Sequence, residues 1–239
     1  MKTYISNREL EELGNGLVSR FVEWSGMTHA PKRVDIVGVA HFLGLTVTFE
    51  HIAEEEPDKI GFLSDGRTPL RIRRNGQVVP FLFPLGTIVL DPILRADTES
   101  GRCRFTIAHE IAHYVICRHN PVPQFHRIYD SERCYSPEEL KQHLTAEEAQ
   151  ADRLAAVILM PEATVRRALS YYHRGCQISV YGQNVIHGDD KKTIRKMAGC
   201  LGVSYTALLI RLKELHLMDY RPLSEYVDTT LRGGVLPWQ

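Results

Sequence analysis

The sequence predicts an α+β fold, and three observations carry this prediction. Short runs rich in β-branched residues, separated by glycine and other turn residues, precede residue 91. Longer segments with apolar residues three and four apart, a spacing typical of amphipathic helices, dominate after residue 98. At 239 residues the chain is long enough to bury a substantial core.

Two helices and four strands are expected in the first part of the chain. A charged amphipathic helix is predicted over 6–24, and a second helix over 34–43, where Gly44 ends it. Strands are predicted over four short segments that turn residues separate: 45–49, 61–63, 70–73 and 86–90.

The next helix is predicted over about 98–119, and it carries the pentapeptide His109-Glu110-Ile111-Ala112-His113. Its capping candidates are Asp97, Thr98 and Ser100, and its apolar stripe consists of Phe105, Ala108, Ala112, Val115 and Ile116. Residues four apart lie on one helix face, so His109 and His113 can bind a single ion. Glu110 lies beside them, where it could act as a general base on water. This arrangement is typical of a zinc peptidase.

A catalytic zinc site needs a third protein ligand, and a second amphipathic helix over about 145–160 offers one. Glu148 and Asp152 lie four apart there, so Glu148 could bind the metal while Asp152 accepts a hydrogen bond from a ligating histidine. Glu147 stays open as an alternative ligand. Glu148 could also serve only as the capping-box partner of Thr145.

His119 is a further alternative, because it follows His113 at the spacing of the third histidine in metzincins. Those enzymes need a glycine in the interval, where this chain has Ile116. On a continuous helix His119 would point roughly 100° away from the other two histidines. We therefore expect it not to bind the metal.

The two helices together resemble the ImmA/IrrE family of zinc metallopeptidases. The resemblance lies in RFTIAHEIAHYVICRH, followed by EEAQADRLAAVILMP, with the same order and spacing as the family motifs. It implies a zincin-like core related to thermolysin, one Zn²⁺ held by His109, His113 and Glu148, and Glu110 as the general base. Ala112 and Leu154 stand where the family usually has glycine and phenylalanine, and neither is a site residue.

Between the two helices, the segment 120–144 is rich in proline and polar residues, and we expect it to be irregular and to lie near the cleft. Its candidates for stabilising an oxyanion are His126, Tyr129, Tyr135 and His143, and none is assigned. In zincins a sheet edge beside the metal helix pairs with the extended substrate. Our candidate for that edge is Thr87 to Leu90, and an ordinary core strand is the alternative.

The C-terminal part predicts a helix from Pro161 to about Tyr172, a polar loop, and a helix-turn-helix pattern within 193–218. From Asp189 to Asp219 six basic residues oppose four acidic ones, which is a weak basic footprint for binding DNA. We therefore expect packing or partner binding, and no direct nucleic-acid binding. The predicted organisation is a zincin-like domain over 1–175, a helix-turn-helix-like appendage over 189–219, and a tail over 220–239.

Composition predicts a soluble cytoplasmic protein. The formal net charge is zero, with 29 basic and 29 acidic residues, so no global field favours nucleic acid or an anionic membrane. No signal core or membrane-spanning run is present, and the five cysteines form no CxxC motif.

The functional prediction from the two metal-binding helices is a zinc metalloendopeptidase. The resemblance implies that its substrate is a helix-turn-helix transcriptional repressor, as in phage, mobile-element or stress regulation. The alternative is a non-enzymatic regulator that zinc stabilises and that binds DNA or a repressor partner.

Overall fold

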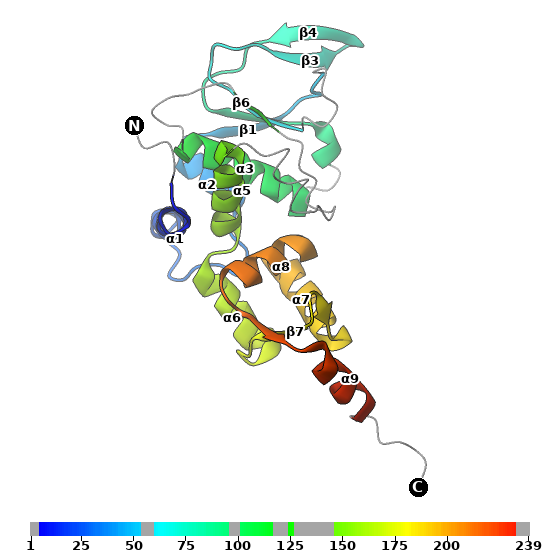
Figure 1. The fold of residues 1–239 in the computed structure, drawn as a ribbon. Coiled ribbons are helices and arrows are strands. Elements are labelled where there is room, and N and C mark those ends of the chain that lie inside the picture. The colour runs from blue at the N-terminus through cyan, green and yellow to red at the C-terminus, as the bar shows by residue number, and fades with distance from the viewer. Residues whose placement is uncertain (1–4, 54–59, 96–100, 117–123, 127–145, 233–239) are drawn as a thin grey trace.

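A computed structural model describes residues 5–53, 60–95, 101–116, 124–126 and 146–232. The fold is α+β, as the sequence predicts: a four-stranded sheet, a two-stranded hairpin and a three-stranded sheet combine with helices that carry most of the core. Figure 1 shows the four-stranded sheet and the hairpin at one end of the molecule and the C-terminal helices at the other.

The two N-terminal helices begin where their capping residues place them. Helix α1 (Asn7–Trp24) follows Ser6, whose side chain accepts from the backbone N–H of Glu9, while the Glu9 carboxylate accepts from the backbone N–H of Ser6. Helix α2 (Ile36–Phe42) follows Asp35, which accepts from the backbone N–H of Gly38.

The four-stranded sheet has the order β1-β5-β2-β6. Its strands are β1 (Thr46–Phe49), β5 (Thr87–Leu90), β2 (Gly61–Leu63) and β6 (Gln124–His126). The pair β1–β5 is parallel, and the pairs β2–β5 and β2–β6 are antiparallel.

The structure decides between the two interpretations of residues 87–90 in favour of a core strand, and it corrects one further prediction about this sheet. Strand β5, our candidate for a free edge, is an interior strand that is buried along its whole length, because β1 and β2 pair with both of its sides. The segment expected to be irregular contributes β6, which forms an outer edge of the sheet. That pairing joins residues far apart in the chain, so no local pattern announces it.

The two faces of the sheet pack against different partners. Ile88 and Leu90 belong to the main core with the helices, while Phe62 and Val89 belong to a second apolar cluster. The hairpin of β3 (Leu70–Arg74) and β4 (Gln77–Phe81) covers that second cluster. Only the first strand of this hairpin is predicted from the sequence. Figure 1 shows the helices on one side of the sheet and the hairpin on the other.

A short 3₁₀ turn, η1 (Pro92–Leu94), leads from β5 toward α3 (Gly101–Ile116). Helix α3 packs along α5 (Ala146–Leu159), and both helices are predicted from the sequence to within a few residues. The predicted capping residues of α3 lie outside the described residues.

The C-terminal part contains four helices and three strands among the described residues: α6 (Glu162–His173), β7 (Ile178–Tyr181), β8 (Val185–Ile186), α7 (Gly188–Leu201), α8 (Tyr205–Glu214), β9 (Met218–Arg221) and α9 (Leu223–Arg232). The helix–turn–helix pattern is confirmed as α7 and α8, joined through Gly202 and capped by Ser204. One expectation is wrong, because β7 and β8 stand within the predicted polar loop. The range 220–239, predicted as a tail, contains the end of β9 and α9. These strands are only two to four residues long, too short to give a clear periodic pattern.

The turn between α7 and α8 packs against the start of α3. Arg104 donates from Nε to the carbonyl oxygen of Gly202 at 3.0 Å, and from Nη2 to that of Val34 at 2.6 Å. A methyl group on Gly101 would lie 2.7 Å from the backbone nitrogen of Ser204, so this approach requires glycine. Within the described ranges, no helix is both long and apolar enough to cross a membrane.

Candidate metal centre

Helix α3 presents His109, Glu110 and His113 on its buried side. Each residue is at most 2% exposed. Helix α3 packs against the sheet and α5, and most residues around these three are apolar. The three polar side chains are therefore buried together with the apolar core that surrounds them. Buried ionisable groups require partners, and α5 supplies them.

Helix α5 brings Glu148 and Asp152 to the two histidines. Glu148 Oε2 lies 3.3 Å from His109 Nε2, and Glu148 Oε1 lies 3.6 Å from His113 Nε2. Asp152, one turn further along, lies on the other side of the His109 ring. Both carboxylates are about one-fifth exposed, so the cluster sits at the edge of the core.

The donor atoms have a spacing that suits a zinc ion. Nε2 of His109 and Nε2 of His113 are 3.0 Å apart, and ligand atoms of His109, His113 and Glu148 all lie within 4.8 Å of one another. A tetrahedral zinc with bonds of about 2.0–2.2 Å needs its ligand atoms roughly 3.3–3.6 Å apart. Two imidazole nitrogens and one carboxylate oxygen also leave a fourth position open, as hydrolytic zinc sites do. The residues present therefore fit the ion.

The His109 ring is oriented by Asp152. Its Nδ1 donates to Oδ1 of Asp152 at 2.8 Å, which leaves Nε2 facing His113 and Glu148. Burial lowers the pKa of His109, but hydrogen bonds to Asp152 and Glu148 and the negative charge of Asp152 and Glu110 raise it from 6.5 to about 9. The local charge therefore favours a cation within this cluster, whether a proton or a metal ion.

Glu110 stands against strand β2. A methyl group on Gly61 would lie 2.9 Å from Oε1 of Glu110 and 2.6 Å from Cγ2 of Thr106. Gly61 is not among the site residues predicted from the sequence. The available signal was a glycine inside a predicted strand, which often marks a close approach of another group to the backbone.

The other sequence candidates differ in how far the structure describes them. Glu147 is described and exposed, and the three-residue cluster contains Glu148 instead. His119, Tyr129, Tyr135 and His143 lie outside the described residues. For His126 the structure describes the backbone, which belongs to β6.

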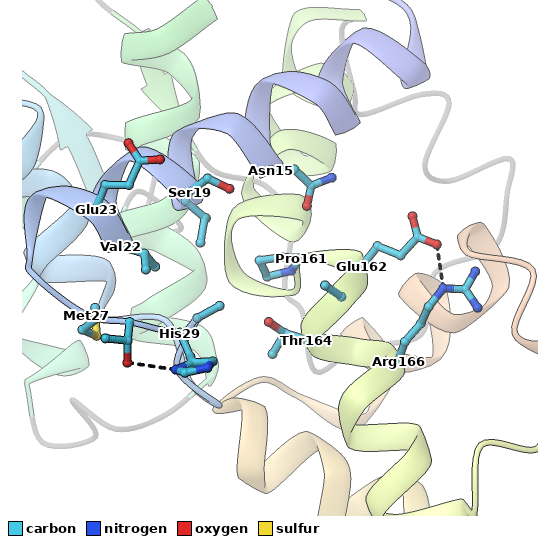
Figure 2. Close-up of a pocket in the computed structure, with 14 residues that line it drawn as sticks. Asn15, Ser19, Val22, Glu23, Met27, His29, Pro161, Glu162, Thr164 and Arg166 are labelled. Carbon is cyan, nitrogen blue, oxygen red and sulfur yellow. Dashed lines mark hydrogen bonds and ion pairs between the residues drawn. The ribbon is translucent and has the colours of Figure 1, made fainter.

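A separate groove of about 650 Å³ lies between α1, the segment after it and the start of α6 (Figure 2). Figure 2 shows Ser19 and Glu23 on one side and Thr164 and Arg166 on the other. None of its lining residues belongs to the histidine–carboxylate cluster, so this groove is not part of the candidate metal centre.

Comparison with known protein families gives one finding. The family model described as Peptidase_M78, IrrE N-terminal-like domain, matches residues 93–213, slightly more than half of the chain. The match spans both α3 and α5 and extends into α8. No curated protein matches the chain.

Proposed function

The chain belongs to the Peptidase_M78 family, a metallopeptidase family, and on this premise we propose that it is a zinc-dependent endopeptidase. His109, His113 and Glu148 would hold one Zn²⁺, Glu110 would act as general base, and Asp152 would orient His109. The observation that carries this proposal is the convergence of the three ligand atoms within 4.8 Å. The contact from His109 to Asp152 adds support, because ligating histidines usually donate their other ring N–H to a carboxylate or carbonyl.

The choice of Glu148 over Glu147 is supported by exposure and by distance. Glu148 reaches both histidines, while Glu147 is exposed. A capping role for Glu148 would not bring its carboxylate between two buried imidazoles.

Zinc bound at this site would lower the pKa of a water molecule toward ~7 and polarise the scissile carbonyl. The Glu110 carboxylate accepts a proton from the attacking water, and the hydroxyl adds to the carbonyl carbon. Glu110 then donates that proton to the leaving amine nitrogen as the C–N bond breaks. Burial of Glu110 against the backbone of β2 limits the carboxylate to a narrow range of positions, which favours proton transfer in one geometry.

For the substrate, we propose a helix-turn-helix transcriptional repressor encoded near this chain, whose cleavage in the cytoplasm relieves repression. This step rests on the resemblance to the ImmA/IrrE family. The zinc-loaded protein, incubated with that repressor, should cut it at a defined site, and a chelator should stop the cleavage. Tight zinc binding without cleavage of this or any partner would instead favour a non-enzymatic regulator.

We further propose that residues 189–219 support the peptidase rather than bind DNA. Arg211 is fully buried, where it donates to the carbonyl oxygen of Met160 at 3.0 Å and pairs with Glu11. The turn at Gly202 accepts from Arg104 of α3. A segment tied at two points to the site helices and α1 is better suited to holding them than to entering a DNA groove.

A further inference from the structure

Strand β2 is the part of the sheet that borders Glu110. The position of a methyl group on Gly61 is 2.9 Å from Oε1 of Glu110, so the carboxylate lies directly under the backbone of this strand. A peptide that is to be cut must bring one carbonyl close to the same carboxylate. The edge of β2 is therefore the nearest main-chain partner for such a peptide.

Both edges of β2 are filled by the chain itself. On one side β5 pairs with it, from Gly61↔Leu90 to Leu63↔Ile88. On the other side β6 pairs with it antiparallel, with the register Gly61↔His126, Phe62↔Phe125 and Leu63↔Gln124. Gly61, the residue of β2 that borders Glu110, is thus paired with β6.

Strand spacing decides where a substrate main chain can lie. A general base acts within about 3 Å of a proton, or through one water, so the carbonyl that is attacked must lie within roughly 6 Å of it. The Glu110 carboxylate borders Gly61, so β2 marks its position in the sheet. A peptide paired with β2 would lie one strand spacing, about 4.8 Å, from that strand. A peptide on the outer edge of β6 would lie about two spacings away, roughly 9.6 Å from β2 and beyond that reach.

We propose that β6 occupies the main-chain position of the substrate, so that this structure is a self-blocked state of the peptidase and β6 must leave β2 before a peptide is cut. The inference rests on the proposed function. A ladder of three residues with only one neighbouring strand is a weak occupant, which a longer peptide can replace. The cost of displacing it lowers the apparent affinity for every substrate by the fraction of molecules in which β2 is free.

One test breaks the pairing of β6. The backbone groups of Ile60 and Ser64 face β5, so those of Leu63, which is paired with Gln124, face β6. Gln124→Pro therefore removes a backbone N–H that points to β2 and disfavours β6 beside it. The matched control is Thr46→Pro, which removes one bond, from Thr46 N–H to the Gly86 carbonyl oxygen at 3.1 Å, at the opposite edge of the same sheet. The probe is a fluorescent peptide hydroxamate, which binds zinc and extends a peptide backbone, with affinity measured by polarisation on the zinc-loaded full chain. Gln124→Pro should bind it about tenfold more tightly or better, and Thr46→Pro should match the unaltered protein.

A second test needs no substitution. Hydrogen–deuterium exchange on the zinc-loaded, unaltered chain should show faster exchange in β6 when the hydroxamate is bound, while the amides of β2 stay protected. Protection of β6 that persists with the probe bound would overturn the inference, because the peptide would then pair elsewhere. So would equal affinity of Gln124→Pro and the unaltered chain.

The two proposals fail in different ways. Suppose that the unaltered chain binds the hydroxamate and cuts its repressor, while the amides of β6 stay protected with the probe bound. Only the self-blocked state is then wrong. If the zinc-loaded chain and both proline variants neither bind the probe nor cut, the proposed function is wrong and the inference falls with it.

Discussion

Nδ1 of His109 lies 2.8 Å from Oδ1 of Asp152, so one hydrogen bond joins the two site helices and directs the other nitrogen of the ring toward Glu148. Glu148 and Asp152 lie four positions apart on α5, and the two carboxylates hold the ring from opposite sides. Because residues four apart share one face of a helix, both carboxylates reach the same histidine.

Asp152→Ala should weaken zinc binding by about 10–100-fold, because the ring of His109 loses both its orientation and a negative neighbour. Competition with a zinc-chelating dye measures the effect. Asp152→Asn keeps an acceptor at the same place without the charge, so its zinc affinity should lie between those of the unaltered chain and Asp152→Ala. Unchanged affinity in Asp152→Ala would remove Asp152 from the account.

Glu148→Ala should lose most of its bound zinc after dialysis, because only two protein ligands would remain. Glu147→Ala is the matched control, one position away on the same helix and exposed, and it should retain one zinc ion per chain. Metal analysis of the two purified variants checks this. The reverse pattern would make Glu147 the ligand.

Zinc binding should release about one proton at pH 7.5. The pKa of His109 is raised to about 9, so its Nε2 is protonated at this pH without metal, and zinc must replace that proton. Apparent affinity should therefore rise with pH up to about 9 and then level off. Calorimetry in two buffers of different ionisation enthalpy measures the release. In Asp152→Ala the levelling should occur at lower pH, and identical profiles would contradict the assigned cause.

Gly61→Ala should lower kcat by about 10–100-fold while zinc content stays the same, since the new methyl group displaces Glu110. The methyl group would also meet Cγ2 of Thr106. The double variant Gly61→Ala/Thr106→Ser removes that second contact and leaves the first, so its kcat should stay low. Full recovery of kcat in the double variant would assign the effect to Thr106 packing instead.

Much of this fold follows from local sequence signals. Ser6 and Glu9 form a capping box, and the Gly202–Ser204 turn separates two helices whose apolar periods are clear. Glu148 and Asp152 share one side of a predicted helix, so their approach to His109 was accessible from spacing.

The features that sequence reasoning missed depend on contacts between distant segments. Strand β6 exists through its pairing with β2, and Gly61 matters because Glu110 packs onto it. The interior position of β5 had a usable signal, because its apolar residues run without polar alternation, as strands buried on both faces do. The interior position is the core-strand alternative that the sequence left open for residues 87–90.

In the proposed reaction, Glu110 moves a proton at the neighbouring metal site. Glu110→Gln is nearly isosteric and removes the base while leaving His109, His113 and Glu148 in place. Cleavage of the repressor encoded nearby should fall by at least about 100-fold in this variant, with one zinc ion per chain retained by metal analysis. Full cleavage by zinc-loaded Glu110→Gln would contradict the account.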